Sequence, residues 1–161
     1  KRNHEIFSDA KSALETYKGK IDTIISTGVI EHVDSPTMYL EDSLNLLSDK
    51  GSIYLETDNF DDILRKLNIK NFESFFYRTA HLTYFSSDTL VKLFEKVGFS
   101  QVQVLFRHNF DFSNFAVWSS ENVPSGNGKL NYFDNKFNTT WKSYLEESGL
   151  ADLVCIKARK I

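Results

Sequence analysis

The sequence predicts an α/β fold in a single domain that spans residues 1–161. The main observation is the run from Ile21 to Asp58, which is typical of a buried strand, a polar turn, an amphipathic helix and a second buried strand. Such a β-α-β crossover brings its polar turn to the carboxyl end of the first strand, where open α/β sheets bind ligands. A second observation is that two later runs, 86–106 and 138–158, repeat the order of a helix followed by a strand.

The elements of the crossover, and the helix before it, follow from local signals. A helix over Ala10–Tyr17 is expected to begin at Asp9, a residue type that caps helices. Residues 21–26 are mostly β-branched and apolar, as in a strand covered on both faces. Pro36 suits the first turn of the next helix. The expected apolar stripe of that helix consists of Met38, Leu40, Leu44 and Leu47.

Turn and cap residues predict the remaining elements. Asp49–Gly51 has the chemistry of a turn. Ser86 and Gly98 are expected to begin and end a helix as its N-cap and C-cap. Residues 71–85 are expected to be irregular, whereas residues 108–132 are weakly patterned, with a loop at 124–128. The other expected elements are strands at 52–56, 102–106 and 152–158 and helices at 60–67 and 138–148.

Composition and charge exclude several classes of protein. The net charge of -3 argues against a general binder of nucleic acid or membrane surfaces, because both need a basic face. Cys155 is the single cysteine, which excludes an internal disulfide and suits a cytoplasmic location. No apolar run reaches the length of a transmembrane helix. Because the only methionine is Met38 and the chain begins at Lys1, we expect the chain to be a piece of a longer protein.

Five short segments, in a common order and at workable spacing, carry a family resemblance. They are Ile21–Ile25 for FDxI, Val29–Val33 for VLEHV, Leu46–Gly51 for LLKPGG, His81–Phe99 for HLxYFSxxxLxxLxxxxGF and Gly149–Lys160 for GxADxLxxxARK. Each segment alone recurs by chance, but the ordered set resembles the C-terminal part of class I S-adenosylmethionine-dependent methyltransferases. The most similar group modifies small molecules and sugars.

This resemblance implies a fold, a cofactor and a kind of acceptor. The fold would be a partial Rossmann-like methyltransferase sheet, with strands four to seven and the last strand antiparallel. The cofactor would be S-adenosylmethionine, and the acceptor a small molecule or a sugar-like compound rather than nucleic acid or a membrane component. The exposed flank left by the absent strands is expected to bind a partner or a second copy of the chain.

The glycine-rich loop that follows the first strand in this family is missing from the pattern. Gly126-Asn127-Gly128 lies late in the chain and does not follow a strand, so it does not match that loop. The missing loop motivates a second candidate function, a catalytically inactive methyltransferase-like binding or assembly module. An unrelated nucleotide-binding protein would need a phosphate loop, which the sequence also lacks.

Four residues are candidates for the cofactor site. Relatives often place an acidic residue before the fourth strand, near the adenine amino group, which makes Asp9 and Ala10 candidates. The alternative is that Asp9 only caps a helix. Thr27 and Gly28 end the fourth strand, where relatives bind the methionine end of the cofactor and where glycine permits close approach. A simple strand-to-helix turn would also need this glycine.

His81 and His32 are the candidate catalytic residues. Methyl transfer from a sulfonium is an in-line displacement, so the protein mainly aligns the reactants, and a base is needed only when the acceptor must lose a proton. His81 lies in the connection that forms the acceptor-binding face in relatives, and the matching position in sugar C-methyltransferases is a proposed base. Those enzymes have EHL where this chain has Ala80–Leu82. The alternative for His81 is packing against Phe85 with a backbone hydrogen bond.

Glu31 and His32 could hold an acceptor hydroxyl, hold a metal ion, or brace their loop. Some quinone-pathway O-methyltransferases resemble this segment and use acidic and histidine residues there for a divalent ion. Their additional upstream acid corresponds to Gly28 here, and two ligands on adjacent residues make a thin metal site. The sequence therefore favours no metal.

The aromatic side chains of residues 71–85 have two interpretations. They could line an acceptor pocket, as rings often do. At this density, rings more often fill a core, and the sequence favours the core. The residues concerned are Phe75, Phe76, Tyr77 and Tyr84.

Overall fold

A computed structural model describes residues 4–161 and has a four-stranded mixed sheet at its centre. The strands are β1 (Ile21–Thr27), β2 (Leu47–Asp58), β3 (Ser100–Arg107) and β4 (Leu153–Arg159), in the spatial order β1-β2-β4-β3. β1 and β2 are parallel, whereas β4 runs antiparallel to both of its neighbours. The predicted α/β class and the antiparallel last strand are confirmed.

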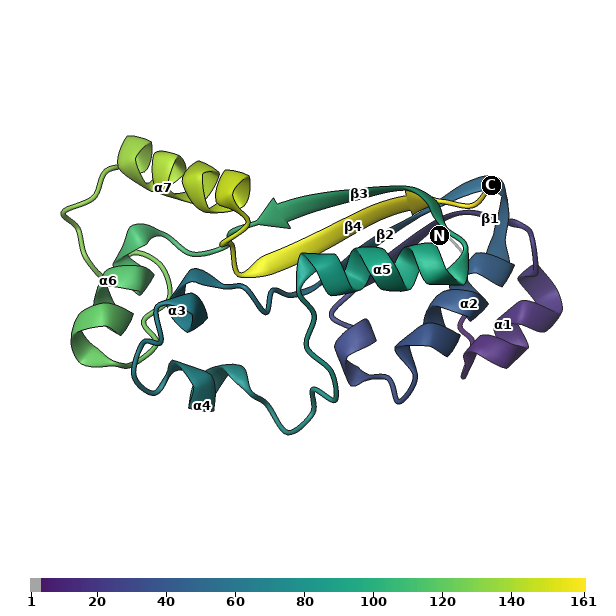
Figure 1. Ribbon diagram of the computed structural model, residues 1–161, viewed down its shortest axis with the longest axis horizontal. Coiled ribbons are helices and arrows are strands. Elements are labelled where there is room, and N and C mark those ends of the chain that lie inside the picture. Colours follow the sequence, from purple (N-terminus) through teal and green to yellow (C-terminus); the bar gives the residue numbers. More distant parts are fainter. Residues whose placement is uncertain (1–3) are drawn as a thin grey trace.

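Two helices, α2 (Pro36–Leu46) and α5 (Ser87–Val97), cover one face of this sheet (Figure 1). The caps predicted for α5 are confirmed, because the Ser86 side chain accepts from the amide of Thr89 and Gly98 takes a left-handed conformation. The fully buried side chains of Leu40 and Phe94 pack with the apolar residues of β2 and β4 in the main core.

A second group of helices lies beyond the end of the sheet at which β1 and β2 finish (Figure 1). It consists of α3 (Ile63–Lys66), α4 (Phe72–Phe76), α6 (Phe112–Glu121) and α7 (Asn135–Ser148). Leu64, Phe72, Phe76 and Trp118 form a separate buried cluster there. The sheet therefore supplies a frame, and the second group adds a compact body at the edge where its parallel strands end.

Four expectations about individual elements are wrong. The turn at Asp49–Gly51 lies inside β2, where an irregular pairing with β1 accommodates the positive φ of Lys50. Met38 is 61% exposed, so it does not belong to the apolar stripe of α2. The helix expected at 60–67 is limited to α3, and the weakly patterned residues 108–132 contain α6. The expected irregular run 71–85 contains the short helix α4.

Asn59 joins the end of β2 to the turn that precedes β4. Its side chain is fully buried, and its amide donates to the carbonyl oxygens of Gly149, at 3.0 Å, and Ala151, at 2.8 Å. The backbone amide of Asn59 donates to the carbonyl oxygen of Asp152 at 2.8 Å. This clamp fixes the position of Asp152 relative to the carboxyl end of β2.

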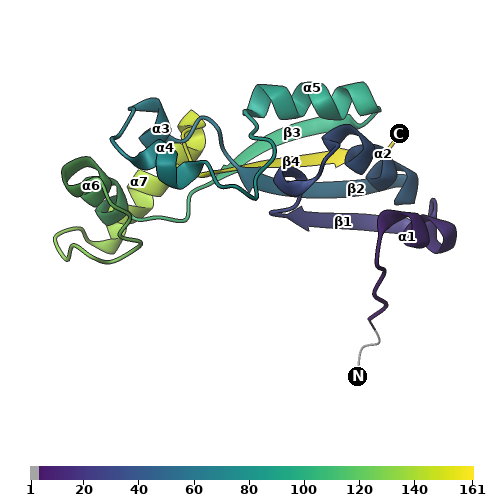
Figure 2. The ribbon, with the colours of Figure 1, turned by 90° about the horizontal axis from the view of Figure 1, so that it is seen from below.

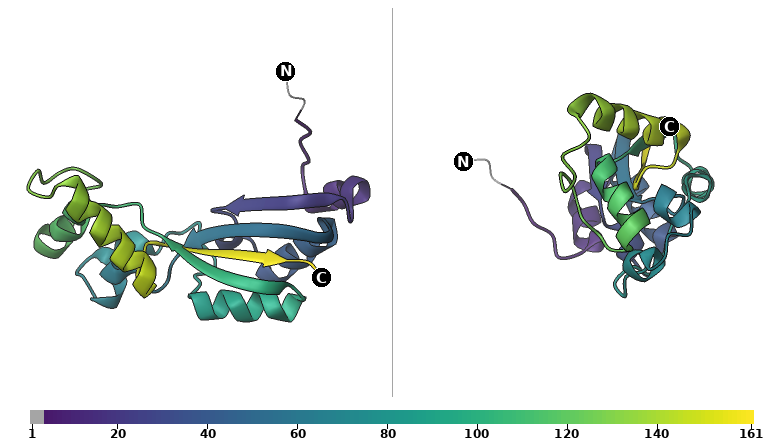
Figure 3. Two further views of the ribbon diagram at one scale, coloured as in Figure 1. Left: turned by 90° about the horizontal axis from the view of Figure 1, so that it is seen from above. Right: turned by 90° about the vertical axis from the view of Figure 1, so that its left-hand side faces the viewer.

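β1 lies at one edge of the sheet (Figure 3, left). Within residues 4–161 it pairs with β2 alone, and Ile25 in its middle is 73% exposed. The described chain therefore presents an exposed edge strand, as the sequence predicts. None of the helices in the described part is long and apolar enough to cross a membrane.

Candidate functional site

The turn after β1 places polar groups at the carboxyl edge of the sheet. Gly28 has a φ of +64°, a conformation that favours glycine, and its amide donates to the carbonyl oxygen of Glu56 at 3.0 Å. Thr27 and Gly28 are both exposed. The short 3₁₀ helix η1 (Ile30–His32) follows and carries the Glu31-His32 pair.

Glu31 and His32 brace the segment that carries His81. The carbonyl oxygen of Glu31 accepts from the amide of Leu82 at 2.7 Å, and its buried carboxylate accepts from the Thr57 hydroxyl at 2.9 Å. His32 Nδ1 lies 2.8 Å from the carbonyl oxygen of Ala80. Because a carbonyl oxygen can only accept, His32 Nδ1 is the donor of this hydrogen bond. The bracing role that the sequence left open is therefore present in the structure.

His81 lies against His32 and a carboxylate. Its side chain is 6% exposed, and its ring centroid is 4.6 Å from that of His32. Its Nδ1 is 3.4 Å from Asp58 Oδ2, yet makes no hydrogen bond with any residue that the structure describes. The nearest ring on its own segment is Tyr84, at 5.5 Å, so the alternative of packing on Phe85 with a backbone hydrogen bond is not what the structure shows.

Burial raises the pKa of Asp58, while the nearby His81 and Arg78 partly oppose this rise. The raised pKa means that Asp58 loses part of its hydration in the folded chain. Asp58 is thus an anionic partner placed beside the histidine pair, at the point where β2 ends.

Glu31, His32 and His81 each offer one ligand atom within 4.8 Å of the others. The sequence argued against a metal because Glu31 and His32 alone are adjacent residues, and it could not place His81 beside them. The three side chains together are a set that could hold a divalent cation.

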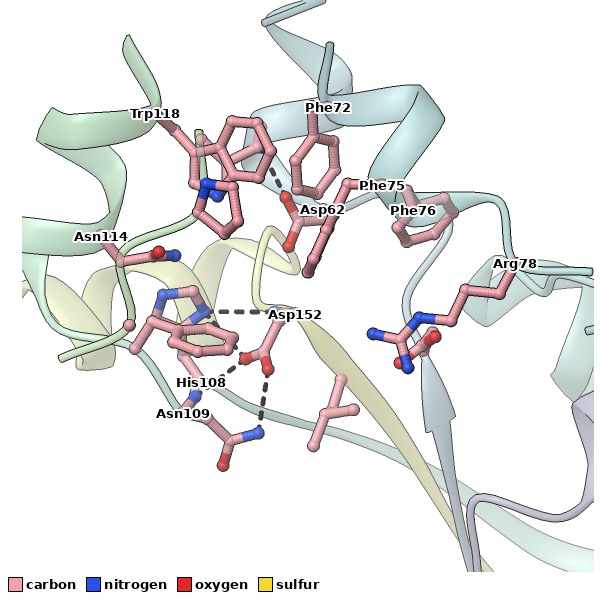
Figure 4. A pocket seen from close by; sticks show the side chains of 16 residues that line it. Asp62, Phe72, Phe75, Phe76, Arg78, His108, Asn109, Asn114, Trp118 and Asp152 are labelled. Atoms are coloured by element: carbon pink, nitrogen blue, oxygen red, sulfur yellow. Dashed lines mark hydrogen bonds and ion pairs between the residues drawn. The ribbon is translucent and has the colours of Figure 1, made fainter. Parts of the chain in front are cut away.

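A cavity of about 280 Å³ adjoins this cluster through Asp58. Aromatic side chains of α4 and α6 form much of its wall (Figure 4). We call it the ring-walled cavity because it is lined by the aromatic side chains of Phe72, Phe75, Phe76, Phe110 and Trp118. Its polar lining consists of Asp58, Asp62, Arg78, His108, Asn109, Asn114 and Asp152.

Two acidic side chains in the cavity differ in their surroundings. The Asp152 carboxylate accepts from the backbone and side-chain amides of Asn109, at 2.8 and 2.9 Å, and lies 3.1 Å from His108 Nδ1. Asp62 accepts from the amide of Leu64 at 2.6 Å, as the N-cap of α3. Burial raises the pKa of Asp62 to about 6. The Asp152 carboxylate therefore has several polar partners, whereas the Asp62 carboxylate is buried with few.

The candidate cofactor residues do not all come together. The Asp9 carboxylate caps α1 (Ala10–Tyr17) by accepting from the amide of Ser12 at 2.8 Å, and its hydrogen bonds to residues 12 and 8 lower its pKa. α1 lies beside the end at which β1 begins (Figure 2), whereas Thr27 and Gly28 lie at its other end. Asp9 and Ala10 are thus separated from Thr27 and Gly28.

The aromatic residues of 71–85 contribute to the second core and to the wall of the cavity, which Tyr77 and Tyr84 do not line. Phe72 and Phe76 are buried in the second core, and Phe75 and Tyr77 are 45% and 44% exposed. Sequence reasoning missed the residues of α6 and the acidic residue before α3. Asp111, which caps α6 through the amide of Asn114, is the local signal that could have revealed that helix.

A family model described as a methyltransferase domain matches residues 1–104. No curated protein matches the sequence. Among solved structures, a SAM-dependent methyltransferase from Archaeoglobus fulgidus is 16% identical, with a TM-score of 0.58. The match covers 96% of this chain and 66% of that protein.

A second similar structure comes from Thermotoga maritima and is described as a SAM-dependent methyltransferase, possibly a histamine N-methyltransferase. It is 19% identical with a TM-score of 0.56, and the match covers 89% of this chain and 57% of that one. At these identities the likeness concerns the fold. The chain spans 57% and 66% of the lengths of these two proteins.

Proposed function

Because the chain belongs to the methyltransferase-domain family, we propose that it supplies the acceptor side of an S-adenosylmethionine-dependent methyltransferase. The acceptor is a small molecule or a sugar-like compound, and the enzyme acts in the cytoplasm. The observation that carries the proposal is the contact of His81 with His32 and Asp58 at the carboxyl edge of the sheet, beside the ring-walled cavity.

This cluster has a position suited to methyl transfer. Gly28 and Thr27 precede it along the chain, at the end of β1, and Asp58 belongs to both the cluster and the cavity wall. An acceptor held in the cavity would present its reactive atom near His81. Rigid placement of the two reactants is the main contribution that this reaction requires from the protein.

Four of the candidate residues, His81, His32, Thr27 and Gly28, have a role in this proposal. When bound, S-adenosylmethionine would supply an activated methyl group to the acceptor atom. His81 accepts the proton that the acceptor loses, and Asp58 stabilises the resulting imidazolium. His32 holds the His81 ring in place. Thr27 and Gly28 contact the methionine end of the cofactor.

Asp9 and Ala10 stay a prediction for the adenine end. The proposal does not depend on them.

Calorimetric titration of the full-length protein with S-adenosylhomocysteine tests the cofactor assignment. We expect binding, and we expect Gly28→Ala to weaken it because the new side chain disfavours the φ of +64° at the cofactor edge. Gly19→Ala is the matched control, since Gly19 has a φ of +68° and open space around it.

Absence of binding to a folded wild-type protein would reject the enzyme. It would instead favour the inactive binding or assembly module, which the missing glycine-rich loop motivates.

A further inference from the structure

We propose that the ring-walled cavity binds an acceptor that carries a protonated amine on an apolar or aromatic body, and that Asp62 holds the amine. The inference rests on the proposed function, because the ligand of this cavity is taken to be the methyl acceptor. The amine is an anchoring group, and the methylated atom lies toward His81. The proposal is carried by the surroundings of Asp62 and by the distribution of charge in the cavity.

Asp62 is a buried acid without a counter-ion. It is 4% exposed, and among residues 4–161 it takes part in no ion pair. An ionised carboxylate in such a place is unfavourable unless a cation compensates it. A cationic ligand would supply that compensation.

The walls around Asp62 suit a cation as well as an apolar body. The carboxylate lies beside the rings of Phe72 and Phe75 (Figure 4). Phe72 and Trp118 meet edge to face, with centroids 5.2 Å apart. The faces of aromatic rings attract cations, and this attraction grows when water is excluded. Rings and a carboxylate together recognise an ammonium group from several sides.

The basic groups near the cavity already face other partners. His108 Nδ1 accepts from the backbone amide of Asp152 at 3.1 Å and lies 3.1 Å from the Asp152 carboxylate, while the charge of Arg78 acts on Asp58. On α3, Arg65 donates to the carbonyl oxygen of Phe60, and Lys66 pairs with Asp61 at 2.8 Å. Within residues 4–161 no basic side chain forms an ion pair with Asp62, and the charge of His108 only partly opposes the effect of burial on the pKa of Asp62, so this carboxylate suits a cationic ligand better than an anionic one.

Titration calorimetry with three small probes tests the proposal on the full-length protein, without cofactor. The probes are phenethylamine, its neutral counterpart 2-phenylethanol and the anion 3-phenylpropionate. At pH 7.5 we expect phenethylamine to bind about tenfold tighter than the alcohol or better, because a charged pair in a dry site adds to the ring contacts. The anion should bind most weakly.

Two variants assign the effect to one carboxylate. Asp62→Asn keeps an acceptor for the amide of Leu64, and it should bind the amine and the alcohol equally. Asp61→Asn is the control, because Asp61 pairs with Lys66 and does not line the cavity. It should retain the wild-type preference.

Equal binding of amine and alcohol by the wild type, a preference that survives Asp62→Asn, or no binding of any probe would each overturn the proposal. Cofactor binding is a separate measurement. A protein that binds S-adenosylhomocysteine but shows no amine preference would reject this inference alone.

Discussion

The negative charge of Asp62 favours the proposed binding of an amine but lowers the stability of the folded chain. It caps α3 through the amide of Leu64, a role that asparagine fulfils equally well. What distinguishes the acid is its charge, which the fold buries without a partner. The chain would thus be more stable with a neutral residue in this position.

The pH dependence of stability should reveal this opposition. The folded pKa of Asp62, about 6, lies above its usual value of 3.8, so between these limits the folded state holds a proton that the unfolded state has lost. Asp62 therefore lowers stability as the pH rises through this window, by about 3 kcal/mol in total. Asp62→Asn does not have this loss. Its free energy of unfolding should exceed that of the wild type at pH 7 and match it near pH 4.

Urea unfolding at the two pH values measures the difference. Asp61→Asn should show no such pH-dependent gain, because Asp61 is already paired with Lys66. If the free energies of unfolding of the wild type and Asp62→Asn differ by the same amount at both pH values, Asp62 is not the group with the raised pKa.

His81 should affect turnover more than cofactor affinity. His81→Gln removes the proposed base while retaining a polar side chain, and general-base catalysis contributes about 10²- to 10⁴-fold. We expect kcat for methyl transfer to fall within that range and S-adenosylhomocysteine to bind as before. His4→Gln, an exposed histidine far along the chain from the cluster, is the control. An unchanged kcat for His81→Gln would remove His81 from the mechanism.

At the scale of elements, the clamp of Asn59 connects the sheet to the cavity. The buried Asn59 side chain links the end of β2 to the carbonyl oxygens of Gly149 and Ala151, just before β4. Its loss should loosen the turn that carries Asp152.

Asn59→Ala should destabilise the fold by about 2–4 kcal/mol, because the carbonyl oxygens of Gly149 and Ala151 lose their side-chain donor in a buried place. Chemical denaturation measures the change in the free energy of unfolding. Asn135→Ala, at an exposed position of α7, should change it by less than about 0.5 kcal/mol. Similar decreases in the free energy of unfolding of both variants would show that the hydrogen bonds of Asn59 contribute no more to stability than an exposed side chain does.

The sequence predicted the elements whose signals are local. α5 shows this best, because Ser86, the apolar spacing and Gly98 all agree. The start of β2 differs from the prediction. Lys50-Gly51 is typical of a turn, but the same residues also occur where the pairing of two strands is irregular, as it is here. Gly51 is closely packed, as a Cβ there would lie 2.9 Å from the carbonyl oxygen of Ser48. Only the pairing with β1, which no local pattern encodes, decides between turn and strand.

At the scale of the whole molecule, the exposed edge of β1 predicts self-association of the chain when it is produced as residues 1–161. Ile25→Lys places a charge in the middle of this edge and should shift a dimer toward monomer, because charged residues oppose edge pairing. Light scattering after size-exclusion chromatography measures the mass. Leu105→Lys, a half-exposed position on the opposite edge strand β3, should leave the association unchanged. A monomeric wild type would contradict the prediction.

The site was less predictable than the sheet. The crossover located Gly28, Glu31 and His32 at the carboxyl edge, because a parallel strand order requires it. His81 was a candidate only through a family resemblance, and its contact with Asp58 joins the end of β2 to the connection that follows this strand. Asp62 gave no signal at all, since its significance comes from burial beneath rings that lie up to 56 positions later, at Trp118.

The origin of the cavity lining has a consequence for how this protein can diversify. Every lining residue is Asp58 or follows it, and those from His108 to Leu153 lie beyond the segment, 1–104, that the family shares. Lineages could therefore inherit the same strand frame while exchanging the far wall piece by piece. On the proposed function, two relatives with matching first halves would then differ in the acceptor that they bind, and residues 108–126 would be the segment in which to compare them.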